Sequence, residues 1–260
     1  MVILSAAKVS LSYFSYCPQL KQPWPNIFMI KQPKPASTLC LLRNVGASLE
    51  VFLMRRRMGG AFSGMHVFPG GVVDPEDSML DVEVSHPSMA MFANNQEFEG
   101  EHSATAYWAA AIRETFEESG LLLAYDKQGR FLGGEVGVFD IQRQQLNDKQ
   151  LSFNDFLSEQ GLTPAFDRLT YLSRRITPAF APARFDTHFF LTVVPEGADG
   201  MPCNMELKDC FWITPEEALS RAKTDIEMVR PTLKTLELLL PFNRAEEAFD
   251  HFEHQWLSSR

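Results

Sequence analysis

The stretch AAIRETFEESGLLL, residues 110–123, places three glutamates within five positions: Glu114, Glu117 and Glu118. Because each residue of an α-helix turns by about 100°, the three carboxylates would lie on one side of a helix. The apolar positions between them would face another side and pack on a sheet. Gly120 is well placed to end such a helix in a left-handed cap. The sequence therefore predicts a helix over residues 105–119 with one acidic face and one core-facing side.

These crowded carboxylates would repel one another unless a positive charge lay close to them. Carboxylates three and four positions apart on a helix repel each other, by about a few tenths of a kcal/mol per exposed pair. No lysine lies between Thr105 and Asp126, and Arg113 is a single positive charge against three negative ones. A divalent cation such as Mg²⁺ or Mn²⁺, which prefers oxygen ligands, would relieve the repulsion. Spacing alone leaves an ordinary solvated acidic face as the alternative.

The composition narrows the classes of protein to consider. Of the 260 residues, 45% are hydrophobic, which is enough for a folded core. The formal net charge of −9 argues against a nucleic-acid-binding protein, and no run approaches the roughly 20 apolar residues of a membrane span. None of the cysteines forms a C-x-x-C pair, so we expect a cytoplasmic protein without a disulfide framework or zinc knuckle. These cysteines are Cys17, Cys40, Cys203 and Cys210.

The chain is predicted to consist of an N-terminal extension, residues 1–35, and a single domain, residues 36–260. Strands are indicated on either side of Gly46 and at residues 168–177 and 184–194. Residues 78–104 show no clear period and resemble an insertion. Strands and helices mix without a regular βαβ alternation, which favours an α+β fold: an αβα sandwich with a central mixed sheet and extra C-terminal helices.

The C-terminal helices carry start signals of unequal strength. Thr214 is an N-cap residue, with Pro215 at the first helical position and Glu217 completing a capping box. A further helix is predicted near residues 231–240. The last one, near residues 243–256, has only a weaker cap pair, Asn243 and Glu246. We therefore expect this last helix to begin at Asn243.

Residues 113–121, RETFEESGL, resemble the second half of the Nudix box, G-x5-E-x7-R-E-U-x-E-E-x-G-U, where U is a bulky apolar residue. Thr115 departs from the pattern at the first U. Upstream, HVFPGGVVDPEDS resembles the first half, with Gly71 at the opening glycine. The arginine follows 28 residues later than the family spacing requires, which agrees with an insertion over residues 78–104. The early glutamate of the box is therefore replaced by Asp77 or Glu76, or is absent.

A split box preceded by FPGG is similar to the coenzyme A diphosphatase branch of the Nudix hydrolases, and the likeness covers residues 36–240. This resemblance implies hydrolysis of a phosphoanhydride bond, dependent on Mg²⁺ or Mn²⁺, in coenzyme A or acyl-coenzyme A, giving 3′,5′-ADP and (acyl-)phosphopantetheine. ADP-ribose, a nucleotide sugar or a dinucleoside polyphosphate is an alternative substrate. A Nudix-like sensor that binds a nucleotide without cleaving it is the alternative of a different class.

The same resemblance assigns roles to particular residues. It implies that Glu114, Glu117 and Glu118 hold the metal and carry catalysis, that Gly71 lets the backbone approach the metal, and that Arg113 orients Glu117. The expected substrate contacts are Arg55, Arg56, Arg184, Phe185 and Glu206. The carboxylate that accepts a proton from water stays open. The expected partner is a small nucleotide diphosphate, without nucleic acid or membrane, and a homodimer is left open.

Overall fold

The computed structural model describes residues 31–56, 59, 62–80, 87–93, 102–200 and 207–259. Contacts divide the chain into two units, Met1–Lys31 and Gln32–Arg260, and the second of these contains the fold described below. Glu206, one of the residues expected to contact substrate, lies outside the described residues, as do Cys17 and Cys203. Cys40 and Cys210 are free thiols.

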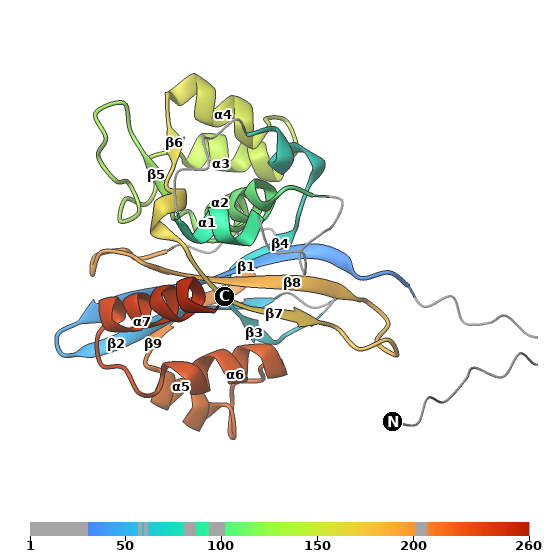
Figure 1. Ribbon diagram of the computed structural model, residues 1–260, viewed down its shortest axis with the longest axis vertical. Helices are drawn as coiled ribbons and strands as arrows, with labels where there is room; N and C mark the ends of the chain where they lie inside the picture. The colour runs from blue at the N-terminus through green and yellow to red at the C-terminus, as the bar shows by residue number, and fades with distance from the viewer. Residues whose placement is uncertain are drawn as a thin grey trace, which may run out of the picture. The chain divides into compact units, whose positions relative to one another are not determined.

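A seven-stranded mixed sheet forms the centre of this unit (Figure 1). Its main order is β3-β2-β1-β8-β7, with β4 paired to β1 and β9 to β2. β1 runs parallel to β8 and antiparallel to β2 and β4. The strands are β1 (Lys34–Val45), β2 (Ser48–Arg56), β3 (His66–Val67), β4 (Gly70–Val72), β7 (Thr170–Ile176), β8 (Phe185–Val193) and β9 (Leu207–Ile213).

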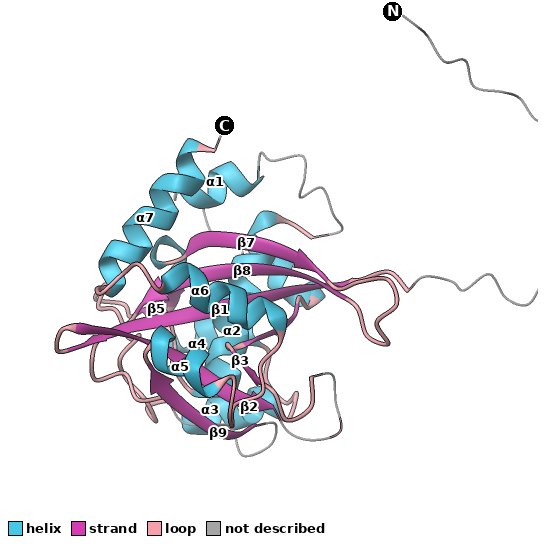
Figure 2. Ribbon diagram, turned by 90° about the horizontal axis from the view of Figure 1, so that it is seen from below, coloured by secondary structure: helices cyan, strands magenta, loops and turns pink. Residues whose placement is uncertain are grey.

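Helices cover both faces of the sheet (Figures 1 and 2). One group follows β4 in the chain: α1 (Pro87–Ala93), α2 (Ala104–Ser119), α3 (Asp140–Asn147) and α4 (Phe153–Gln160). The C-terminal group is α5 (Pro215–Arg221), α6 (Arg230–Leu239) and α7 (Ala245–Ser258). A small second sheet pairs β5 (Ala124–Tyr125) with β6 (Thr163–Pro164), and short 3₁₀ turns are η2 (Pro75–Met79) and η4 (Phe166–Arg168). None of the helices in the described ranges is both long and apolar enough to cross a membrane.

β1 separates two hydrophobic cores. Leu39 and Leu41 belong to the core that contains α2, and Cys40 and Leu42 belong to the core that contains α5, α6 and α7. Successive strand residues point to opposite faces, so a strand covered on both faces reads as a continuous apolar run, as β1 does. The predicted αβα sandwich with a central mixed sheet is therefore confirmed.

The predicted glutamate helix is observed as α2, within one residue of its expected start. The Ser103 side chain accepts a hydrogen bond from the Ala106 N–H, and Gly120 adopts a φ of 75° at the other end. The insertion, by contrast, contains an unpredicted helix, α1, whose Met89 and Phe92 are buried. Seven residues are too few for a sequence period to stand out, and packing stabilises this helix instead.

The start of the last helix differs from the sequence prediction. Thr214 caps α5 as expected, because its side chain accepts from the Glu217 N–H. α7, however, begins at Ala245 after Arg244. Its first N–H is capped by the side chain of Asn44 on β1, at 2.9 Å. The predicted cap at Asn243 is thus wrong, because a residue about 200 positions away in the chain supplies the acceptor.

Candidate active site

Two glycines bring β4 against the acidic face of α2. The Gly70 N–H donates to Glu118 Oε2 at 2.8 Å. A Cβ on Gly71 would lie 2.5 Å from the carboxylate carbon of Glu114, and one on Gly70 would lie 2.3 Å from the Ser37 carbonyl oxygen. Neither position has room for a side chain, so the glycine pair allows the strand to pass between β1 and the carboxylates.

Arg113 is the centre of a buried ion network, and its side chain is only 6% exposed. Its Nε and Nη2 donate to both oxygens of Asp77 at 2.9 Å. Nη1 donates to Glu114 Oε1 at 2.9 Å and to Glu117 Oε1 at 3.5 Å, and Nη2 also donates to the Val72 carbonyl at 3.0 Å. The expected contact with Glu117 is therefore present, but the contacts with Asp77 and Glu114 are shorter.

The sequence left the early acidic position of the box open between Asp77 and Glu76. Asp77 lies six residues after Gly71, is 2% exposed and forms the paired bonds to Arg113. Its Oδ2 also accepts the Asp74 N–H at 2.8 Å, which anchors the η2 turn. Glu76 is exposed. Of these two residues, Asp77 is therefore the one that contacts Arg113.

Burial and neighbouring charges shift the pKa values of these side chains in opposite directions. Burial raises the pKa of Glu114 to about 7, although the neighbouring Arg113 lowers it. Burial likewise raises the pKa of Glu117, and Arg113 and Lys149 oppose that rise. For Arg113, burial alone would lower the pKa, but hydrogen bonding to Asp77 and the nearby carboxylates hold the pKa above its ordinary value. The α2 face therefore concentrates negative charge in a poorly solvated place.

The donor chemistry of this face fits a hard divalent cation, because carboxylate oxygens are the ligands that such ions prefer. In the described part of the chain, no three acidic, histidine or cysteine side chains converge on a common point. Glu118 faces the Gly70 N–H and Glu114 faces Arg113. Binding a cation would thus draw together carboxylates that are now held by separate donors.

A second arginine, which the sequence did not single out, secures the end of α2. Arg143 on α3 is buried, and it donates from Nε to the Glu117 carbonyl at 3.0 Å and from Nη2 to the Glu118 carbonyl at 2.7 Å. These carbonyls belong to the last turn, where intrahelical partners are missing. Gly120 leaves the space, since a Cβ there would lie 2.8 Å from Arg143 Nη1.

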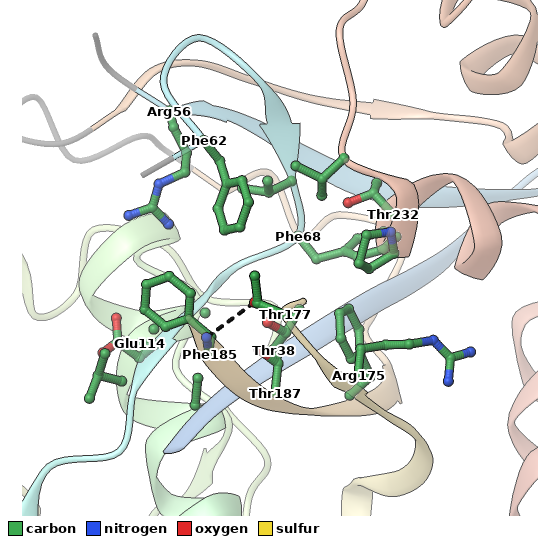
Figure 3. Close-up of a pocket in the computed structure, with 18 of the residues that line it drawn as sticks. Thr38, Arg56, Phe62, Phe68, Glu114, Arg175, Thr177, Phe185, Thr187 and Thr232 are labelled. Atoms are coloured by element: carbon green, nitrogen blue, oxygen red, sulfur yellow. Dashed lines mark hydrogen bonds between the residues drawn. The ribbon is translucent and has the colours of Figure 1, made fainter. Parts of the chain in front are cut away.

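A cavity of about 1130 Å³ opens beside the carboxylates (Figure 3). Of the expected substrate contacts, Arg56 and Phe185 line it. Arg55 and Arg184 are not among the lining residues. Arg55 Nε donates to the Gly64 carbonyl at 3.3 Å, and Arg184 Nε donates to the Thr177 carbonyl at 3.1 Å. Lining residues that the sequence did not suggest include Phe62, Lys149 and Thr232.

The αβα sandwich and the carboxylate helix packed against a glycine-bearing strand are those of the Nudix superfamily. A solved NUDIX hydrolase from Alicyclobacillus acidocaldarius shares the fold, with a TM-score of 0.70 and 27% identity over 84% of this chain and 96% of that one. More particularly, the family model described as the NUDT19 Nudix domain matches residues 28–238. The chain therefore belongs to the NUDT19 Nudix domain family.

Two relatives are named acyl-coenzyme A diphosphatase NUDT19. The protein from Xenopus laevis is 26% identical over 219 residues, covering 70% of this chain and 57% of the relative. The protein from Gallus gallus is 25% identical over 217 residues, covering 67% of this chain and 56% of the relative. The chain thus spans little more than half the length of either relative.

Proposed function

We propose that this chain is a metal-dependent diphosphatase that hydrolyses the phosphoanhydride bond of coenzyme A or acyl-coenzyme A, giving 3′,5′-ADP and (acyl-)phosphopantetheine. One observation carries the proposal: Glu114, Glu117 and Glu118 are crowded at the edge of a cavity of about 1130 Å³. The names of the two NUDT19 relatives support the choice of substrate. We also propose that residues 36–260 act as one domain, in keeping with the unit Gln32–Arg260.

Glu114, Glu117 and Glu118, with the backbone at Gly71, would hold Mg²⁺ or Mn²⁺. When bound, such an ion offsets the charge of a diphosphate and lowers the pKa of a coordinated water. The chain's own contribution is positioning. Asp77 fixes Arg113, and Arg113 in turn holds Glu114, while the Gly70 N–H holds Glu118. In the reaction, a water oxygen attacks one phosphorus, the bridging P–O bond breaks, and a carboxylate at this site takes the proton from water.

Cationic and aromatic side chains near the carboxylates could bind the diphosphate oxygens and the base of a nucleotide. Arg56 and Lys149 line the cavity and would meet the diphosphate oxygens. The rings of Phe62 and Phe185 lie 6.1 Å apart at 43° (Figure 3), and would contact the base. Arg55 and Arg184 do not line the cavity, so we assign them no direct contact.

A substrate panel tests this proposal. Initial rates with Mg²⁺ and with Mn²⁺ are compared for coenzyme A, acyl-coenzyme A, ADP-ribose, NADH and a dinucleoside polyphosphate. Coenzyme A or its thioesters are expected to give the highest kcat/KM and to release 3′,5′-ADP. A hundredfold preference for ADP-ribose would contradict the coenzyme A assignment. Failure to release a phosphate ester from every compound, with either metal, would favour a nucleotide-binding sensor.

A further inference from the structure

The cavity has two ends of different chemistry. The charged end contains Arg56, Asp74, Glu114, Glu117, Glu118 and Lys149. The neutral end contains Thr38, Phe68, Phe189, Met228, Val229 and Thr232. Glu114 and Arg56 lie on one side of the cavity, and Thr232 and Phe68 lie on the other (Figure 3). A ligand that fills the cavity would therefore present a charged group at one end and an uncharged group at the other.

The strand register fixes the order of residues along the cavity floor. β1 and β8 contribute three cross-strand pairs: Lys34 with Phe185, Ala36 with Thr187, and Thr38 with Phe189. Alternate residues of a strand point to the same face, so all of these face the cavity. The first pair lies at the cavity's outer edge, since Lys34 is exposed, whereas Phe189 is buried. The floor thus leads inward toward Thr38 and Phe189.

Phe68 and the start of α6 enclose the inner part of the cavity. The Leu39 N–H donates to the Pro69 carbonyl at 2.9 Å, which places Phe68 beside the Thr38 position of β1. A β-bridge between His66 and Met228 brings the segment before α6 to the same place. Phe68 is 2% exposed and Thr232 is 2% exposed. The neutral end is therefore a deep, mostly apolar pocket beneath the N-terminus of α6.

Thr232 contributes a hydroxyl group to the wall of this pocket. It occupies the first turn of α6 and lines the cavity, with its hydroxyl turned toward the interior (Figure 3). The residue is 2% exposed and lies on the wall of the cavity, where a ligand can form a hydrogen bond with its hydroxyl. α6 also begins without a side-chain cap, so its first backbone N–H groups lack intrahelical acceptors. A ligand with carbonyl oxygens could accept hydrogen bonds from this hydroxyl and from these N–H groups.

The charged side chains near the neutral end do not compensate a buried anion. Arg175, Arg230 and Lys234 also line the cavity, but all three are exposed. Lys234 pairs with Glu237, and Arg175 donates to the Arg174 carbonyl at 2.9 Å. Burying a phosphate without a paired cation is strongly unfavourable. An uncharged group that combines methylene and methyl surface with amides fits the pocket better.

We propose that the neutral end binds the uncharged, amide-bearing arm of the substrate, the pantetheine half of coenzyme A, and that Thr232 is a specificity-determining residue that hydrogen-bonds an amide of this arm. This inference rests on the proposed function. Phe68, Phe189 and Met228 contact the aliphatic part of the arm. The diphosphate lies at the charged end, and the nucleotide extends toward Phe62 and Phe185.

The test compares Thr232→Val with two matched variants. Valine keeps the shape of threonine but removes the hydroxyl, and Thr232→Ser restores the hydroxyl. Thr235→Val is the control, because Thr235 is buried on the same helix but does not line the cavity. Thermal melting shows that each variant is folded. kcat/KM is measured for coenzyme A and for ADP-ribose, which shares the diphosphate and adenosine but lacks the arm.

Thr232→Val is expected to lower kcat/KM for coenzyme A about tenfold, the size of one lost hydrogen bond, and to change that for ADP-ribose less than twofold. Thr232→Ser should recover most of the lost kcat/KM for coenzyme A. Thr235→Val should leave the ratio of kcat/KM for coenzyme A to that for ADP-ribose unchanged. An equal loss for both substrates would overturn the assignment. So would an effect that vanishes with 3′-dephospho-coenzyme A, because the neutral end would then bind the 3′-phosphate.

A binding measurement tests this inference independently of the proposed catalytic function. If the wild-type chain cleaves no diphosphate, the proposed function fails, and calorimetry with 4′-phosphopantetheine still tests the pocket. Weaker binding of this compound to Thr232→Val than to wild type supports the inference. Equal binding to both refutes it.

Discussion

The two ends of the cavity differ in the side chains that line them: carboxylates at one end, and mostly apolar side chains with hydroxyls at the other. At the charged end, buried Arg113 donates to Glu114 and Glu117, the Gly70 N–H donates to Glu118, and burial raises the pKa of Glu114 and Glu117. Among the described residues at the neutral end, the side chains that are not exposed are apolar apart from a hydroxyl on α6 and one on β1, and the cations Arg175, Arg230 and Lys234 are exposed. The comparison indicates that the charged end needs a ligand of opposite charge, whereas the neutral end needs only a hydrogen-bonding partner and apolar surface.

The largest effect is expected at the charged end. Glu114→Gln removes one negative charge and keeps the side-chain volume, so the fold should persist while kcat falls about a hundredfold to a thousandfold. The measurement is kcat for coenzyme A at saturating Mg²⁺, with circular dichroism as a check on folding. Unchanged turnover would show that Glu114 is not a metal ligand and would remove the main distinction between the two ends.

Gly71, which lets β4 lie close to the carboxylates, should affect activity through the position of Glu114 and not through charge. In Gly71→Ala the new methyl would lie 2.5 Å from the Glu114 carboxylate, so the carboxylate must move. A displacement of about 1 Å in a catalytic group can lower activity about a hundredfold, and we expect a loss of that order. Gly197→Ala is the matched control, because a Cβ there meets nothing within 4 Å. Equal activity of both variants would contradict the close approach.

His188 is a titratable group that the same strand buries among aromatic rings. It lies on β8 between two floor residues but on the opposite face, against Phe92, Tyr107 and Tyr171. Burial lowers its pKa to about 4, with Asp186 raising the pKa and Arg174 lowering it. The folded state therefore keeps His188 neutral at pH values where the unfolded chain protonates it.

The difference between the folded and the unfolded pKa of His188 sets how stability changes with pH. Because the folded pKa lies below the usual 6.5, stability is lost as the pH falls from about 6.5 toward 4. We expect His188 to contribute a loss of about 2 kcal/mol in unfolding free energy between pH 7 and pH 5. Urea unfolding of wild type and His188→Gln at both pH values measures it. If the two proteins lose stability equally, His188 is not buried in the neutral form.

The smallest effect is expected at Lys149, on the rim of the charged end. Its φ of 57° is strained for a residue with a side chain, and its Nζ lies 3.9 Å from Asp74 Oδ2. Lys149→Gly should relieve the backbone strain and stabilise the fold by up to about 1 kcal/mol, while raising KM for coenzyme A severalfold. A lower stability together with an unchanged KM would mean that the lysine serves the fold and not the substrate. Lys149→Asn, which tolerates this backbone conformation, is the companion variant.

The sequence predicted the elements whose signals are local. Helix periodicity and the Gly120 cap placed α2 within one residue, and the Thr214 cap placed α5. Of the expected substrate contacts, Arg56 and Phe185 line the cavity, but Arg55, next to Arg56, does not. Adjacent strand residues point to opposite faces, so a cluster of arginines at a strand end could not show which of them faces the cavity.

The sequence by itself determined that this chain carries three carboxylates on one helical face inside a Nudix box, because the spacing of residues along one helix fixes which side chains lie together. Only the tertiary structure decided that Asp77 joins Arg113 across the insertion, that Asn44 caps α7, and that Thr232 faces the cavity. These pairs form because the sheet and its two cores bring distant segments together. No local propensity encodes such contacts.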